Sequence, residues 1–237
     1  MCGADDHRAH EVSAEGRGAE FSALEMFADK LLTFCDRTGE VLEIRAEIQD
    51  TDESFIPLSG RAVDTTIKLR SGPGGPPLKL EWTAQKGKEL LVGSTGRPHF
   101  NKSGPVDESE CWIAVMQEDM QEVSYINARD NYSKLSVAAG CTAVGSWASH
   151  EGCRWSQLHS MWFFMPRKIQ RLTGDKAVVF KPLLMAVPAG AGDEPMGDFE
   201  ADAIILAEPP LHGNGKRGCS DFCFVPGTRD CHVSACW

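Results

Sequence analysis

Four oxygen-bearing side chains recur along the chain, each directly ahead of a β-hairpin pattern. They are Ser22, Glu81, Glu151 and Ser220, and successive members lie about 60 to 70 residues apart. A quasi-regular period predicts an array of antiparallel units; in a propeller the first strand of each unit lines a central channel. Two carboxylates and two hydroxyls meeting there would suit a hard cation such as Ca²⁺. The alternative is four unrelated hairpins, each preceded by a surface Glu or Ser.

The elements that must position these side chains are predicted from strand-forming runs that flank short turns. In the third hairpin, strands are expected at Gly152–Trp155 and Met161–Met165, and Pro166 is expected to end the ladder pairing. The other expected hairpin strands are Ala23–Phe27 with Leu31–Cys35, Trp82–Gln85 with Glu89–Gly93, and Asp221–Val225 with a strand from Cys231. Further strands are predicted at Glu40–Arg45, Cys111–Met116, Ala177–Val187 and Ala201–Ala207, with a short helix at Asn131–Ala139.

Composition narrows the class of protein. The chain has 237 residues, a net charge of −10 and 42% hydrophobic residues, which suits one or two globular domains. The acidic balance argues against binding to a nucleic-acid polymer, which needs a basic surface. No apolar run is long enough to predict a membrane span, and no signal-peptide pattern precedes the first hairpin.

The nine cysteines form no dense disulfide pattern. A weaker metal hypothesis is a Cys/His site near the C-terminus, although the intervals match no zinc-ligand spacing. Its candidate residues are Cys219, Cys223, Cys231, Cys236, His212 and His232.

Seven segments, in the same order, resemble the calcium-activated apyrases, the soluble calcium-dependent nucleotidases. The longest is His150-Glu151…Trp155-Ser156…Trp162-Phe163-Phe164-Met165-Pro166-Arg167. The others are Gly16–Leu24 with Lys30–Gly39, Leu80–Ala84, Leu91–Gly96, Asn131-Tyr132…Ala138–Gly140 and Ser220–Thr228. Their common order along the chain, more than any one segment, carries the resemblance.

The resemblance implies a five-bladed β-propeller, here partial, with about four blades over residues 16–237 after a disordered tail at 1–15. It implies calcium-dependent hydrolysis of nucleoside di- and triphosphates such as UDP and GDP, in secreted or ER/Golgi proteins. Ser22, Glu81, Glu151 and Ser220 stand where the family has calcium ligands. Asp36 and Arg167 are implied as catalytic residues. Arg37, Gly96 and Arg97 are implied to contact the substrate.

The chain also departs from the family pattern. Ala23 stands where the family commonly has Asp, and Arg97-Pro98-His99 replaces a Lys-Glu-Trp run, so a base contact would fall to His99 or Phe100. The Glu that completes the family's ring has no counterpart before Trp237. These departures leave a second hypothesis open, in which the chain is a catalytically impaired propeller fragment that serves as a binding or structural module. Its open edges would be covered in a homodimer.

Overall fold

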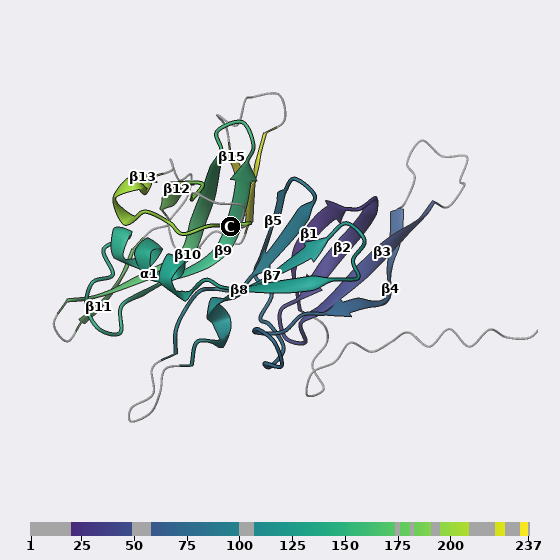
Figure 1. Cartoon of the computed structure of the whole chain (residues 1–237), viewed down its shortest axis with the longest axis horizontal. Coiled ribbons are helices and arrows are strands. Elements are labelled where there is room, and N and C mark those ends of the chain that lie inside the picture. Colours follow the sequence, from purple (N-terminus) through teal and green to yellow (C-terminus); the bar gives the residue numbers. More distant parts are fainter. Residues whose placement is uncertain are drawn as a thin grey trace, which may run out of the picture.

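Antiparallel β-sheets make up most of the chain (Figure 1). The computed structural model describes residues 20–48, 58–99, 107–173, 176–180, 183–190, 195–208, 221–225 and 233–236. No helix in these ranges is long and apolar enough to cross a membrane. The separate antiparallel sheets confirm the predicted all-β class. No sheet in the described ranges closes on itself.

The first sheet is a four-stranded meander in chain order. Its strands are β1 (Phe21–Phe27), β2 (Lys30–Cys35), β3 (Glu40–Ile48) and β4 (Leu58–Lys68). Ala28 and Asp29 both have positive φ, at 51° and 59°, in the two-residue turn between β1 and β2. Two consecutive left-handed residues match the right-handed twist of a hairpin, so this turn keeps the two strands paired to their ends.

The second sheet repeats the meander. It contains β5 (Trp82–Lys86), β6 (Glu89–Gly93), β7 (Trp112–Gln117) and β8 (Val123–Asn127), with the 3₁₀ turn η1 (Ser109–Cys111) before β7. The helix α1 (Arg129–Ala138) follows β8, close to the predicted helix. Gly140 comes after it with φ at 83°, as expected for a residue that ends a helix.

The third sheet is the largest. It contains β9 (Trp147–Ser156), β10 (Met161–Thr173), β11 (Lys176–Phe180), β12 (Leu184–Pro188) and β13 (Ile205–Ala207), in the order β11-β10-β12-β13 with β9 paired to β10. The predicted strand at Ala177–Val187 is in fact two strands, and Ala201–Ala203 forms the 3₁₀ turn η2 before β13. A hairpin of β14 (Asp221–Phe224) and β15 (Val233–Cys236) completes the described part.

The expected end of pairing at Pro166 is wrong. β10 continues to Thr173, and its pairing with β9 extends to Gln170 opposite Trp147. The ladder accommodates the proline through irregularities on both sides of it. A bulge interrupts the ladder at the position where proline cannot donate a hydrogen bond, so the strand can continue.

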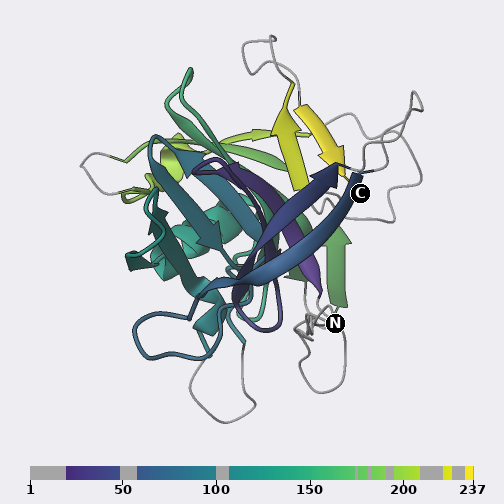
Figure 2. The same cartoon turned by 90° about the vertical axis from the view of Figure 1, so that its right-hand side faces the viewer.

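The sheets lie next to one another in chain order, and their first strands are in contact. β5 packs against both β1 and β9, and β14 packs against β9 (Figures 1 and 2). One apolar cluster, including Phe27, Phe34 and Leu80, lies between the first and second sheets. Another, including Trp82 and Phe164, lies between the second and third sheets. The first strands therefore stand together beside two cores that fix the sheets relative to one another.

Candidate active site on the first strands

Bulges place two of the predicted cation ligands. In β1, Phe21 pairs with Cys35 and Ala23 with Phe34, so Ser22 is the extra residue between them. In β9, Met165 pairs with Gly152 and Pro166 with His150, so Glu151 is likewise skipped. The sequence pattern predicted both residues directly ahead of their strands, and this is wrong: each lies inside its strand, because β1 and β9 begin earlier than expected. A bulge redirects the side chain of the extra residue, which explains why these two polar side chains leave the alternation of their strands.

Ser22 and Glu81 lie side by side. The Ser22 hydroxyl donates to the carbonyl oxygen of Leu80, the residue directly before Glu81. The backbone N–H of Glu81 donates to the Gly93 carbonyl at 2.9 Å, which holds Glu81 at the start of β5. Its buried carboxylate forms an ion pair with Lys79. The structure thus brings the first two predicted ligands together from different sheets.

Glu151 is held by Arg167. The Arg167 Nη1 group donates to both carboxylate oxygens of Glu151, at 2.8 and 2.6 Å. Arg167 is the residue skipped on β10, where Pro166 pairs with His150 and Lys168 with Ser149. Two bulges on adjacent strands therefore turn a carboxylate and a guanidinium toward each other.

The electrostatics of Glu151 connect it to two further residues. Burial raises the pKa of its carboxyl, and this effect outweighs the lowering by Arg167 and by the charge of Lys79. The negative charge of Asp36 raises the pKa further. Because such fields act only over short distances in a solvated protein, Asp36, Lys79, Glu151 and Arg167 share one neighbourhood. Of the predicted catalytic pair, Arg167 contacts Glu151 directly, and Asp36 lies near enough for its charge to act on the same carboxyl.

The other predicted site residues have more varied positions. Ser220 lies outside the described residues, although Asp221 after it begins β14, which packs on β9. Arg37 forms an ion pair with Glu20, with 3.1 Å between Nε and Oε1. The predicted placement of Ser220 beside the other ligands therefore stays a prediction.

Gly96 and Arg97 lie in the loop that follows β6, beside the start of β9. The Arg97 guanidinium carbon lies 4.2 Å from the centre of the Trp147 ring, within range of a cation–π contact. The loop is tied to β9 by the hydrogen bond from the His150 N–H to the Thr95 carbonyl, at 2.9 Å. Gly96 has φ at 69°, and a Cβ there would lie 2.1 Å from the Tyr132 ring. Only glycine fits this turn, so it serves packing as well as any contact with a ligand.

Comparison with known proteins identifies the group to which these residues belong. The family model described as Apyrase matches residues 5–182. The chain belongs to the apyrase family.

It is 31% identical over 226 residues to "Apyrase" of Cimex lectularius, covering 93% of this chain and 55% of that protein. It is 29% identical over 220 residues to "Apyrase apy-1" of Caenorhabditis elegans, covering 92% of this chain and 56% of that protein. It is 32% identical over 223 residues to "Soluble calcium-activated nucleotidase 1" of Rattus norvegicus, covering 92% of this chain and 49% of that protein. This apyrase-family chain therefore spans about half the length of the curated relatives that it matches.

The donors gathered on the first strands of this apyrase-family chain have the chemistry of a hard-cation site. Ser22, the Leu80 carbonyl, Glu81 and Glu151 offer only oxygen atoms, which Ca²⁺ prefers. The two buried carboxylates are each matched by one basic side chain, so this neighbourhood already requires positive charge. Within the described ranges, no three His, Cys, Asp or Glu side chains are grouped closely enough to hold a metal. A cation here would therefore need hydroxyl, carbonyl or water oxygens beside Glu81 and Glu151.

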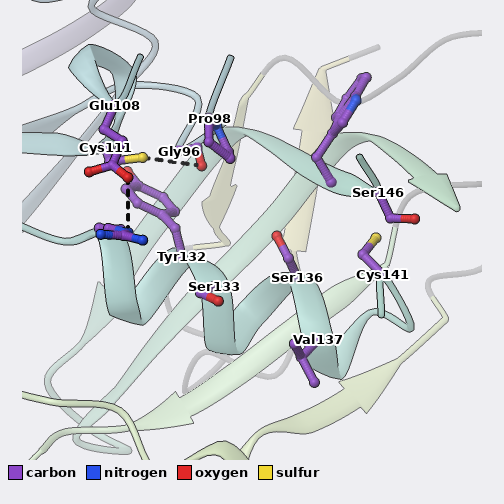
Figure 3. A pocket seen from close by; sticks show the side chains of 12 residues that line it. Gly96, Pro98, Glu108, Cys111, Tyr132, Ser133, Ser136, Val137, Cys141 and Ser146 are labelled. Atoms are coloured by element: carbon purple, nitrogen blue, oxygen red, sulfur yellow. Dashed lines mark hydrogen bonds and ion pairs between the residues drawn. The ribbon is translucent and has the colours of Figure 1, made fainter. Parts of the chain in front are cut away.

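A cavity of about 210 Å³ lies next to the Gly96 loop, against α1 (Figure 3). Its wall includes an ion pair between Glu108 and Arg129 at 3.0 Å. Burial raises the pKa of the Cys111 thiol in this wall to about 12, so that thiol stays protonated at neutral pH. The cavity beside the predicted substrate loop thus has both polar and apolar walls, without a reactive thiolate at Cys111.

Sequence reasoning missed some of the site's polar partners. His99 was expected to offer an aromatic contact to a base, but its Nε2 lies 2.8 Å from Glu110 Oε1, and Glu110 also accepts from Thr95. Phe100, the other candidate, lies outside the described residues. Lys79 was overlooked, although it lies two residues before Glu81, where an extended chain places side chains on the same face. That spacing was the signal that would have revealed it.

Proposed function

We propose that this chain carries the phosphate-hydrolysing site of a calcium-dependent nucleotidase that acts on nucleoside di- and triphosphates, UDP and GDP among them. One observation carries the proposal: buried Glu81 and Glu151 stand on neighbouring first strands, each beside a basic side chain, in an apyrase-family chain. Buried carboxylates paired with partly exposed basic side chains suit a site at which a bound cation and a polyphosphate replace those ion pairs.

The proposed architecture is four blades of a five-bladed propeller. The contacts of β5 with β1 and β9, and of β14 with β9, support it, because the first strands of consecutive blades adjoin at a propeller axis. The two apolar clusters between consecutive sheets also support it, since neighbouring blades pack face to face. In this arrangement the bulged Ser22 and Glu151 face the axis.

Calcium, when bound by Ser22, Glu81, Glu151 and Ser220, would polarise phosphate oxygens and lower the pKa of a bound water. Arg167 would contribute from the protein side, since its exposed guanidinium can bind phosphate oxygens in a bidentate manner. Asp36 lies close enough to Glu151 to raise the pKa of that carboxyl, which suits a role in orienting the attacking water and accepting its proton.

The substrate would extend from Arg167 toward the start of β9. Arg97, held over the Trp147 ring, offers a fixed positive charge there, and Gly96 lets the backbone approach closely. Arg37, paired with Glu20 and partly exposed, would bind the outer phosphate or ribose from the opposite sheet. These contacts are neutral with respect to base identity, so we expect hydrolysis of several nucleotides.

Phosphate release from UDP, with and without a calcium chelator, tests the proposal. We expect release that the chelator abolishes and that Glu81→Gln and Glu151→Gln each reduce at least about tenfold, since a hydrogen bond or contact to a charged oxygen is worth roughly 1.5–3 kcal/mol. Glu118→Gln, which alters an exposed ion pair with Lys88, is the matched control. Chelator-independent release would refute the calcium requirement. A folded chain that releases no phosphate would favour the alternative, a catalytically impaired binding or structural module.

A further inference from the structure

A largely buried arginine connects the first strands of the four sheets in the described part of the chain. Arg154 of β9 donates through Nη1 to the carbonyl oxygen of Thr83 on β5 and, at 3.1 Å, to that of Cys153. Its Nη2 group donates to Asp221 Oδ2 on β14 at 2.9 Å. Glu25 Oε2 on β1 lies 3.9 Å from Nη1. One guanidinium thus contacts oxygens from β1, β5, β9 and β14.

The contacts around Arg154 also bind its partners to one another. The Thr83 hydroxyl donates to Glu25 Oε2 at 3.0 Å, which joins β5 to β1 directly. The Arg154 side chain is only 15% exposed. Burial raises the pKa of the Asp221 carboxyl, and the Arg154 charge opposes that rise. A planar guanidinium with five N–H donors can serve acceptors in several directions, whereas a lysine ammonium cannot match this fork.

This cluster lies immediately along the strands from the proposed cation ligands. Glu25 is three residues after Ser22, and Arg154 is three residues after Glu151. Thr83 is two residues after Glu81, while Asp221 directly follows Ser220. In β1, in β9 and at the start of β5 there are therefore two successive tiers of polar residues: first the ligands Ser22, Glu151 and Glu81, and then the Arg154 cluster.

We propose that Arg154 is a positioning residue that holds the four first strands at the spacing the cation ligands require. The part of this inference that concerns cation binding rests on the proposed function. The structural part, an ionic junction of four strands, does not. Arg154 is assigned no contact with substrate or with the reacting atoms.

Positioning and simple charge predict opposite effects on cation affinity. The Arg154 charge lies one tier from the ligands, so by Coulomb repulsion alone its removal would strengthen cation binding. If Arg154 acts by holding the strands, its removal weakens binding, by about 10- to 100-fold as for other residues that orient metal ligands. Arg154→Gln removes both charge and fork, while Arg154→Lys keeps the charge and loses the fork.

Calcium titration by calorimetry on the whole chain separates these effects. We expect Arg154→Gln and Arg154→Lys both to weaken calcium binding at least about tenfold. Arg171→Gln, the matched control, should leave it unchanged, because the Arg171 Nε group donates to the Ala139 carbonyl at 2.7 Å, at the end of α1, whereas Arg154 contacts β1, β5 and β14. Tighter or unchanged binding in Arg154→Gln, or full affinity in Arg154→Lys, would overturn the positioning role.

Hydrogen exchange in the presence of a chelator tests the junction without any cation. Loss of Arg154 should speed amide exchange in β1, β5 and β14 together, whereas Arg171→Gln should affect only the end of α1 and β10. Exchange that changes in β9 alone would overturn the junction. If the Arg154 variants do not fold, Asp221→Ala gives the same test, because it removes the one contact of Arg154 with β14 and should speed exchange in β14. Failure of the wild-type chain to bind calcium would refute the proposed function, and exchange would still decide whether Arg154 joins the strands.

Discussion

The imidazole of His150 makes the stability of this chain depend on pH. His150 is fully buried, with its ring centre 5.6 Å from that of Tyr132 and 5.5 Å from that of Phe164. Within the described part of the chain, neither ring nitrogen has a hydrogen-bond partner. Burial lowers the pKa of His150 to about 3, from an ordinary 6.5. The folded chain therefore keeps this imidazole neutral.

The sign and size of the effect follow from that difference. Below pH 6.5 the unfolded chain binds a proton at His150 that the folded chain does not bind until about pH 3. The free energy of unfolding consequently falls as the pH drops through this window. Each pH unit costs about 1.4 kcal/mol, so acidification to pH 5.0 should cost roughly 2 kcal/mol through this residue alone.

Urea unfolding at pH 7.5 and 5.0, followed by tryptophan fluorescence with a chelator present, measures this contribution. His150→Leu removes the titrating group from an apolar setting, so its loss of stability between the two pH values should be about 2 kcal/mol smaller than in the wild type. His159→Leu, at an exposed turn position, is the matched control and should behave as the wild type. Equal losses in His150→Leu and wild type would refute the reasoning.

Three further substitutions have defined outcomes. Gly93→Ala would place a Cβ 2.0 Å from the Trp82 ring, so urea denaturation should show a loss of about 1–3 kcal/mol from overpacking; wild-type stability would mean that Trp82 can move aside. Tyr132→Phe removes the hydroxyl that accepts from Trp82 Nε1 at 3.2 Å and should cost about 1 kcal/mol in the same assay, and an unchanged midpoint would contradict this. Lys79→Met removes the partly exposed partner of Glu81 and should tighten calcium binding up to about fivefold by calorimetry, the equivalent of roughly 1 kcal/mol. Weaker binding in that variant would show that Lys79 is not a competing counterion.

Local chemistry was enough to locate most strands. Lys86-Gly87-Lys88 between two strand-forming runs predicted the β5–β6 hairpin, and the structure has Glu89–Gly93 as expected, with Gly87 at φ 61°. The helix before Gly140 was also predicted to within two residues at its start. Predictions failed where cross-strand partners decide the outcome. At Pro166 a local rule indicated an end to pairing, but the long partner β9 lets the ladder resume after two irregularities.

The residue types available for chemistry were determined by the sequence alone: Ser22, Glu81 and Glu151 at recurring positions, and the ordered segments that mark the apyrase family. Turn residues and the alternation of side chains act over a few positions, so they can be read without coordinates. Only the tertiary structure decided which groups become neighbours. The pairing of Glu151 with Arg167 depends on bulges in two strands, and the reach of Arg154 to Asp221 depends on how separate sheets pack. Both require long-range contacts, which no local pattern along the chain encodes.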